Sequence, residues 1–94
     1  MTSGQQYLND RHIERIEENL AKIEAAGFVL TELAEWYGGQ PNTEFKSADG
    51  RHVLRIYGFA RCGLFTAGGT KIDACKLSVY NPATLDRVLA RTAS

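Results

Sequence analysis

The sequence predicts an α+β fold in which an antiparallel β-meander of three to four strands lies between an N-terminal and a C-terminal helix, in the order α-β-β-β-β-α. Three observations indicate this fold class. Apolar residues recur at helical spacing over residues 13–23, strand-like runs separated by turn residues fill 28–80, and Asn-Pro at 81–82 opens a last helical segment. We expect the 94 residues to form a single domain, 1–94, with residues 1–8 flexible.

The first helix is predicted to begin after Asn9 and to end at Gly27. Asparagine is a favourable N-cap, and Leu8 and Ile13 are placed to form a hydrophobic staple around it. The apolar stripe of this helix consists of Ile13, Ile16, Leu20 and Ile23. We therefore expect one face of the helix to pack against the sheet.

Residues 28–47 are predicted to start the meander, with one ambiguity. Phe-Val-Leu at the start of 28–37 favours a strand, whereas Glu-Leu-Ala-Glu favours a short helix over 31–37. We prefer the strand and keep the helix as the alternative. Turn residues then predict a loop over 38–42, a short strand over 43–47 and a turn over 48–50.

The stretch 51–80 is predicted to form two strands joined by a two-residue turn at Gly68-Gly69, because glycine adopts the positive φ that such turns require. This turn fixes the pairs Cys62 with Cys75, Arg61 with Lys76, Phe65 with Ile72, Phe59 with Ser78 and Tyr57 with Tyr80. Since side chains alternate, the core face collects Leu54, Ile56, Gly58, Ala60, Cys62, Leu64, Cys75, Leu77 and Val79. A register error of one residue would exchange the two faces and make the aromatic residues part of the core.

The opposite face of this hairpin is predicted to be cationic and aromatic. Its candidate binding residues are Arg55, Tyr57, Phe59, Arg61, Phe65, Lys76 and Tyr80. Together with Ile72, the aromatic side chains would form a larger exposed apolar patch than a monomer usually carries. We therefore expect a partner to cover this face.

The last helix is predicted to start at Asn81 as its cap and Pro82 as its first residue. Its inward-facing residues are expected to be Leu85, Val88 and Leu89. With both helices on the apolar face of the sheet, the basic and aromatic face stays open.

The charges are unevenly distributed although the formal net charge is zero. Over residues 10–35, seven acidic and three basic residues give −4, and over 46–76, six basic and two acidic residues give +4. A neutral chain argues against strong nonspecific DNA binding, which rests on an excess of Lys and Arg. Neither a secretory signal nor an apolar run long enough for a membrane span is recognisable, so we expect a cytoplasmic protein without membrane contact.

The residues that could carry catalysis are His12, His52, Cys62 and Cys75. They lack the spacing of a nucleophile elbow, a phosphate loop or a zinc site. We therefore predict no enzyme, no cofactor and no metal. Cys62 and Cys75 could form a cross-strand disulfide, but two thiols are expected in a reducing cytosol.

The function expected from these features is that of a small non-enzymatic binding module. Aromatic residues with arginine are typical of protein interfaces, so the partner would be a protein or a second copy of the chain, as for an adaptor, an inhibitor or an accessory protein of a mobile element. The alternative is single-stranded nucleic acid, with Tyr and Phe stacking on bases and Arg and Lys contacting phosphates. Residues 55–60 resemble the K/R-G-F/Y-G/A-F-V pattern of RNA-recognition motifs, with Ile56 where that pattern has glycine.

Overall fold

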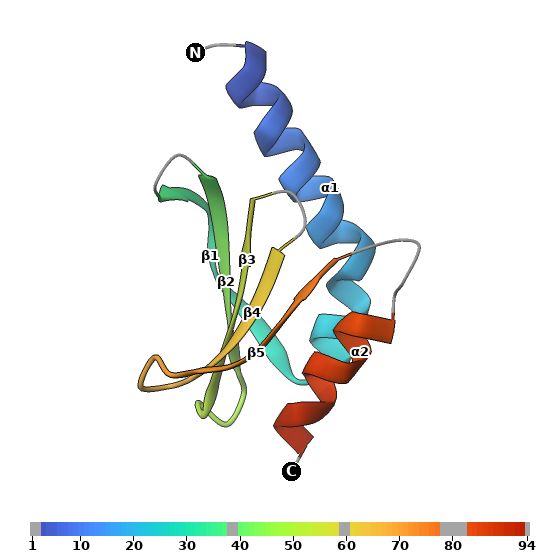
Figure 1. Cartoon of the computed structure of the whole chain (residues 1–94), viewed down its shortest axis with the longest axis vertical. Helices are drawn as coiled ribbons and strands as arrows, with labels where there is room; N and C mark the ends of the chain where they lie inside the picture. Colours follow the sequence, from blue (N-terminus) through green and yellow to red (C-terminus); the bar gives the residue numbers. More distant parts are fainter. Residues whose placement is uncertain (1–2, 38–39, 59–60, 78–82, 94) are drawn as a thin grey trace.

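The structure, a computed structural model, describes residues 3–37, 40–58, 61–77 and 83–93. Its elements are α1 (Ser3–Ala25), β1 (Phe28–Tyr37), β2 (Gln40–Ser47), β3 (His52–Tyr57), β4 (Arg61–Thr66), β5 (Lys71–Lys76) and α2 (Ala83–Ala90), followed by a 3-10 turn over Arg91–Ala93. The strands form one antiparallel sheet in the order β1-β2-β3-β4-β5. Both helices pack on one side of this sheet and leave the other side open (Figure 1).

The α+β class, the antiparallel meander and the two flanking helices are therefore confirmed. The sheet has five strands because the predicted long strand from residue 51 to the hairpin turn is divided at Gly58. Gly58 has a φ of 68°, and its N–H donates a hydrogen bond of 2.9 Å to the carbonyl of Pro41. A positive φ ends the extended conformation there and lets β4 turn back along β3.

Helix α1 starts at Ser3, so the prediction of a start after Asn9 is wrong. Its end is as predicted, because Gly27 has a φ of 91° and its N–H donates to the carbonyl of Glu24 at 2.9 Å. Ile16 and Ile23 are buried and the other two members of the stripe are partly buried against the core. The predicted apolar stripe is confirmed.

The segment 28–37 is a strand, which confirms the preferred interpretation over the short helix. Strand β2 begins at Gln40, three residues earlier than predicted. Within it Pro41 pairs with Trp36 of β1, and Asn42 pairs with both Glu35 and Tyr57. Residues 40–42 therefore belong to the sheet, and the predicted loop is wrong for them, while residues 38–39 lie outside the described part.

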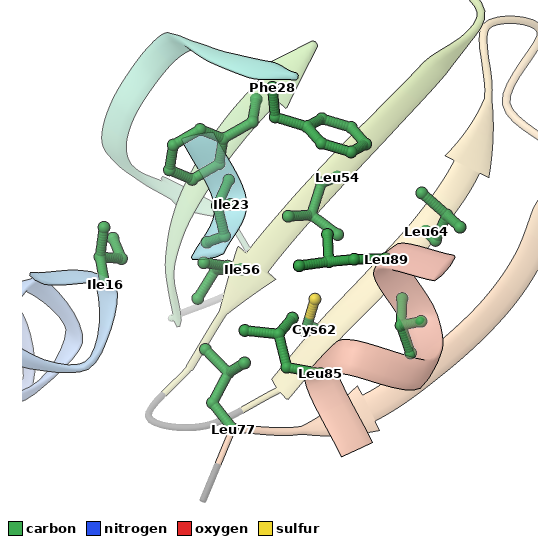
Figure 2. Packing of buried hydrophobic residues seen from close by; sticks show 12 residues of the cluster. Ile16, Ile23, Phe28, Leu54, Ile56, Cys62, Leu64, Leu77, Leu85 and Leu89 are labelled. Carbon is green, nitrogen blue, oxygen red and sulfur yellow. The ribbon is translucent and has the colours of Figure 1, made fainter. Parts of the chain in front are cut away.

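The core lies between the sheet and the two helices (Figure 2). Its fully or nearly fully buried side chains are Ile16, Ile23, Phe28, Phe45, Leu54, Ile56, Cys62, Leu64, Leu77, Leu85, Val88 and Leu89. The three inward-facing residues predicted for the last helix are among them. Each large apolar side chain contributes about 1.5–3 kcal/mol when fully buried, so this cluster holds the helices on one face. Among the described residues, neither helix has the length and apolar character needed to cross a membrane.

Candidate functional site

The hairpin of β4 and β5 has the predicted register over most of its length. Arg61 faces Lys76 and Cys62 faces Cys75, so the alternative of a one-residue slip is wrong. At the turn, however, the N–H of Thr66 donates to the carbonyl of Thr70 at 2.8 Å, which leaves three residues in the loop and not two. The register is restored by an irregularity after Leu64, where one extra residue of β5 is accommodated.

This irregularity changes the place of Ile72. Phe65 pairs with Lys71, so the predicted pair of Phe65 with Ile72 is wrong. Ile72 is half-buried and packs against the core, although the alternation of a regular strand would place it on the open face. The open face therefore loses one of its predicted apolar residues and gains a lysine next to Phe65.

Tyr57 also has different partners from those predicted. It pairs with Arg61 of β4 on one side and with Asn42 of β2 on the other, while the predicted partner Tyr80 lies outside the described residues. Directly opposite residues of antiparallel strands point to the same face, so Tyr57 and Arg61 share a face as predicted. The predicted pair of Phe59 with Ser78 and the candidate residues Phe59 and Tyr80 lie outside the described residues.

The described candidate residues share one face, which we call the outer face. Its members from the prediction are Arg55, Tyr57, Arg61, Phe65 and Lys76. Arg55 lies opposite Gly63, between the pair of Tyr57 with Arg61 and the pair of Val53 with Phe65. The structure therefore brings together five of the seven predicted site residues on neighbouring strands.

The aromatic side chains of this face pack over Gly63. A Cβ atom at residue 63 would lie 2.9 Å from Cε1 of Phe65 and 3.5 Å from the hydroxyl oxygen of Tyr57. Both rings are half-buried, so the described part of the predicted apolar patch is smaller than expected. Among the described residues the exposed large apolar side chains are Val29 and Leu30, on the edge strand β1.

Replacing Gly63 tests this packing. We expect Gly63→Ala to lower the free energy of unfolding by about 1–3 kcal/mol, because the new methyl group displaces the Phe65 ring. Gly68→Ala is the matched control, since the nearest atom to its Cβ position is 3.8 Å away. Urea unfolding measures the free energy of unfolding of both variants. Equal midpoints for the two variants would show that the ring does not rest on the glycine.

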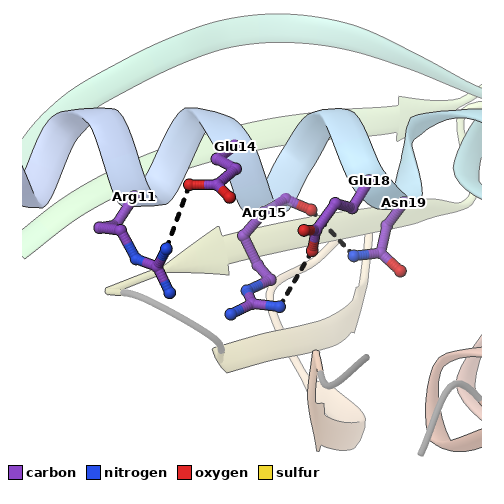
Figure 3. Close-up of polar contacts among 5 residues, drawn as sticks. All are labelled: Arg11, Glu14, Arg15, Glu18 and Asn19. Carbon is purple, nitrogen blue, oxygen red and sulfur yellow. Dashed lines mark hydrogen bonds and ion pairs between the residues drawn. The ribbon is translucent and has the colours of Figure 1, made fainter. Parts of the chain in front are cut away.

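The cations of the outer face differ in their partners. Arg55 forms an ion pair of 2.9 Å with Glu44 of β2. No described acidic side chain lies within ion-pair distance of Arg61, Lys71 or Lys76. On α1, by contrast, Arg11 and Arg15 pair with Glu14 and Glu18 at 3.2 and 2.9 Å (Figure 3).

Arg61 lies directly opposite Lys76, and both residues are exposed. Two like charges in this position destabilise a strand pair. They border a surface hollow of about 300 Å³ that is lined by Tyr57, Arg61, Cys62, Lys71, Ala74, Cys75 and Lys76. We call it the cationic hollow. Its composition suits an anionic group that contacts several cations at once.

His12 holds the turn beside this hollow. Its side chain is fully buried, with Nδ1 at 2.7 Å from the carbonyl oxygen of Gly58 and Nε2 at 2.8 Å from the hydroxyl of Thr43. A carbonyl can only accept, so Nδ1 donates and Nε2 accepts from the hydroxyl. Burial lowers the pKa of His12, and the hydrogen bond to Gly58 opposes this in part. His12 thus fastens α1 to the turn that places Tyr57 opposite Arg61.

Sequence reasoning missed this role. The signal was present, because His12 lies one turn before Ile16 on the apolar stripe of α1 and is therefore directed at the sheet. Its hydrogen-bond partner could not be inferred from the sequence. The carbonyl of Gly58 comes close to His12 only because the chain turns at Gly58, and the local sequence does not predict this turn.

His52, the second histidine, is half-buried in a different place. It lines a hollow of about 210 Å³ together with Ala26, Gly27, Ser47, Ala48, Asp49 and Thr92. The hydroxyl of Ser47 donates to Asp49 at 2.6 Å and lowers the pKa of that exposed carboxyl. Within the described part of the chain, no three His, Cys, Asp or Glu side chains are grouped so that they could hold a metal ion.

Comparisons of the chain with models of protein families, with curated proteins and with solved structures found no match.

Proposed function

We propose that the protein is a non-enzymatic binding module that holds an acidic surface of a protein partner in its cationic hollow, as an adaptor, an inhibitor or an accessory protein of a mobile element would. The observation that carries this proposal is the opposed pair of Arg61 and Lys76, which has no acidic partner among the described residues. Lys71 adds a third positive charge to the same hollow.

The isolated fold keeps an unfavourable contact between Arg61 and Lys76. Like charges directly across a strand pair cost up to about 1 kcal/mol relative to neutral residues. Other described cations form ion pairs, such as Arg55 with Glu44 at 2.9 Å and Arg87 with Asp73 at 3.4 Å. Lys46 and Arg51 also form no ion pair among the described residues, but they do not face another cation across a strand pair. A carboxylate of a partner, placed between Arg61 and Lys76, would replace the repulsion by two charge-assisted hydrogen bonds.

The position of the hollow fits this use. Both helices pack on the opposite face of the sheet, so a partner can approach the outer face without displacing them (Figure 1). The lining of the hollow includes the small side chain of Ala74, which leaves room for a side chain from the partner. Tyr57 at its margin offers an aromatic contact of the kind that is common in protein interfaces.

Single-stranded nucleic acid is the second candidate, favoured by the presence of Tyr57 beside Arg61 and Lys76. Stacking on several bases needs several free ring faces. Phe65 instead lies over Gly63, which leaves Tyr57 as the described stacking residue of the hollow. The acidic protein surface is therefore the better candidate.

A capture experiment with and without nuclease distinguishes the two. The wild-type protein should retain its partner from a lysate of its own cells after nuclease treatment, and the variant Arg61→Ser/Lys76→Ser should not. Lys46→Ser/Arg51→Ser is the matched control, because it removes the same charge from two exposed residues that do not line the hollow. Loss of the captured material on nuclease treatment would support nucleic acid. Equal capture by both double variants would refute a role for the hollow.

A further inference from the structure

Cys62 and Cys75 form a cross-strand pair on β4 and β5. Directly opposite residues of antiparallel strands have Cα atoms about 4.5–5.5 Å apart, which lies within the span of about 4.4–6.8 Å that a disulfide bridges. Both cysteines are free thiols in the structure. The backbone therefore places the two thiols where a disulfide can form between them.

The two thiols have different surroundings. Cys62 is fully buried among the core residues beneath α2, as Figure 2 shows. Cys75 is half-buried on β5, which is an edge strand of the sheet. Access from solvent is therefore open to Cys75 and closed to Cys62.

Groups around Cys75 favour its thiolate. The neighbouring thiol of Cys62 lowers the pKa of Cys75 most strongly, and the charge of Arg87 and the hydroxyl of Thr84 on α2 lower it further. Burial and the charge of Asp73 oppose this lowering in part. The same thiol pair and the burial raise the pKa of Cys62. A partly exposed thiol with a lowered pKa beside a second thiol is the arrangement found in cysteines that react with peroxide.

We propose that Cys75 is an oxidation site for hydroperoxides and that Cys62 is its resolving thiol, so that oxidation closes a disulfide between β4 and β5. In the first step the thiolate of Cys75 attacks one oxygen of hydrogen peroxide, the O–O bond breaks, and the departing hydroxide takes up a proton to become water. The sulfur of Cys75 is now a sulfenic acid.

In the second step the sulfur of Cys62 attacks the sulfur of Cys75. The S–O bond breaks, and the hydroxyl leaves with the proton of the Cys62 thiol as a second water. Two thiols are oxidised to one disulfide while one peroxide is reduced to two molecules of water. Because Arg61 and Lys76 directly flank the two cysteines, the disulfide would fix the edge that carries the cationic hollow.

The test is to treat the folded protein with hydrogen peroxide and to measure the intact mass without reductant. The wild-type chain should lose two hydrogen atoms, remain monomeric and return to its original mass with dithiothreitol. Cys62→Ala should stop at the sulfenic acid of Cys75, which dimedone traps. Cys75→Ala should keep its buried thiol unmodified under the same conditions.

Several results would overturn the proposal. The wild type could keep both thiols, or its disulfide could join two chains. The thiol that remains in each single variant, Cys62 in Cys75→Ala and Cys75 in Cys62→Ala, could also react equally fast with peroxide. Far-ultraviolet circular dichroism checks the fold of each variant.

A measurement on the wild type covers the case in which a variant unfolds. Brief alkylation followed by peptide mapping should label Cys75 about tenfold faster than Cys62, since only exposed thiolates react readily. Equal labelling would contradict the assignment.

Discussion

Replacing His12 by alanine should lower the free energy of unfolding by about 3 kcal/mol, because the change leaves a cavity under α1 and removes a hydrogen-bond partner from the buried Thr43 and from the half-buried Gly58. The carbonyl of Gly58 and the hydroxyl of Thr43 lose contacts of 2.7 and 2.8 Å. His52→Ala is the control, since His52 is only half-buried and its Nδ1 has no hydrogen-bond partner among the described residues. Urea unfolding should show a loss below about 1 kcal/mol for the control. Equal losses would contradict the role given to His12.

The pH dependence of stability gives a second measure of the same residue. The pKa of His12 is lowered from its ordinary value of 6.5 in the folded protein, so below about pH 6.5 the unfolded chain binds a proton that the folded chain does not. The contribution of His12 to stability is therefore complete above that pH. It decreases as the pH falls below that value and levels off under the folded-state pKa. His12→Ala should lack this change, and its persistence in the variant would assign it to another group.

Replacing Arg61 by glutamate should change stability and binding in opposite directions. Glutamate at residue 61 would face Lys76 and convert a repulsion into an attraction, so the free energy of unfolding should rise by about 0.5–1 kcal/mol. The same change places a negative charge in the cationic hollow, so binding of the acidic partner should weaken by about 30-fold or more.

The control for this variant is Lys46→Glu, which makes the same kind of charge change on β2, outside the hollow. Lys46 is exposed and faces Val29 and Val53. The free energy of unfolding of Lys46→Glu should therefore differ from that of the wild type by less than about 0.5 kcal/mol. A fall in the stability of Arg61→Glu, measured by urea unfolding, would show that the pair with Lys76 is not unfavourable in the native protein.

The pair of Cys62 with Cys75 shows that the register can be predicted correctly although the turn is predicted incorrectly. The sequence predicts two residues in the turn at Gly68-Gly69, whereas the loop contains three, with only the second of these glycines at a positive φ of 95°. The irregularity after Leu64 adds a residue on β5 and restores the register. Local turn chemistry could not reveal the compensation, because it depends on Ile72 packing against the core.

The division between β3 and β4 escaped sequence reasoning for a related reason. Gly58 lies between Ile-Tyr and Phe-Ala in a stretch of alternating residues, so periodicity favours a continuous strand. The turn is held from a distance, by Pro41 through the N–H of Gly58 and by His12 through its carbonyl. The assignment of Tyr57 and Arg61 to one face was nevertheless correct. Residues four apart share a face in a continuous strand, and the two residues also share a face as direct partners on β3 and β4.

The central claim is that the cationic hollow, and not the overall charge, binds an acidic protein partner. The most direct measurement is the dissociation constant of the purified, nuclease-treated partner for Arg61→Glu and for Lys46→Glu at one salt concentration. We predict binding about 30-fold or more weaker for the first variant and nearly unchanged for the second. Equal dissociation constants for the two variants would contradict the claim.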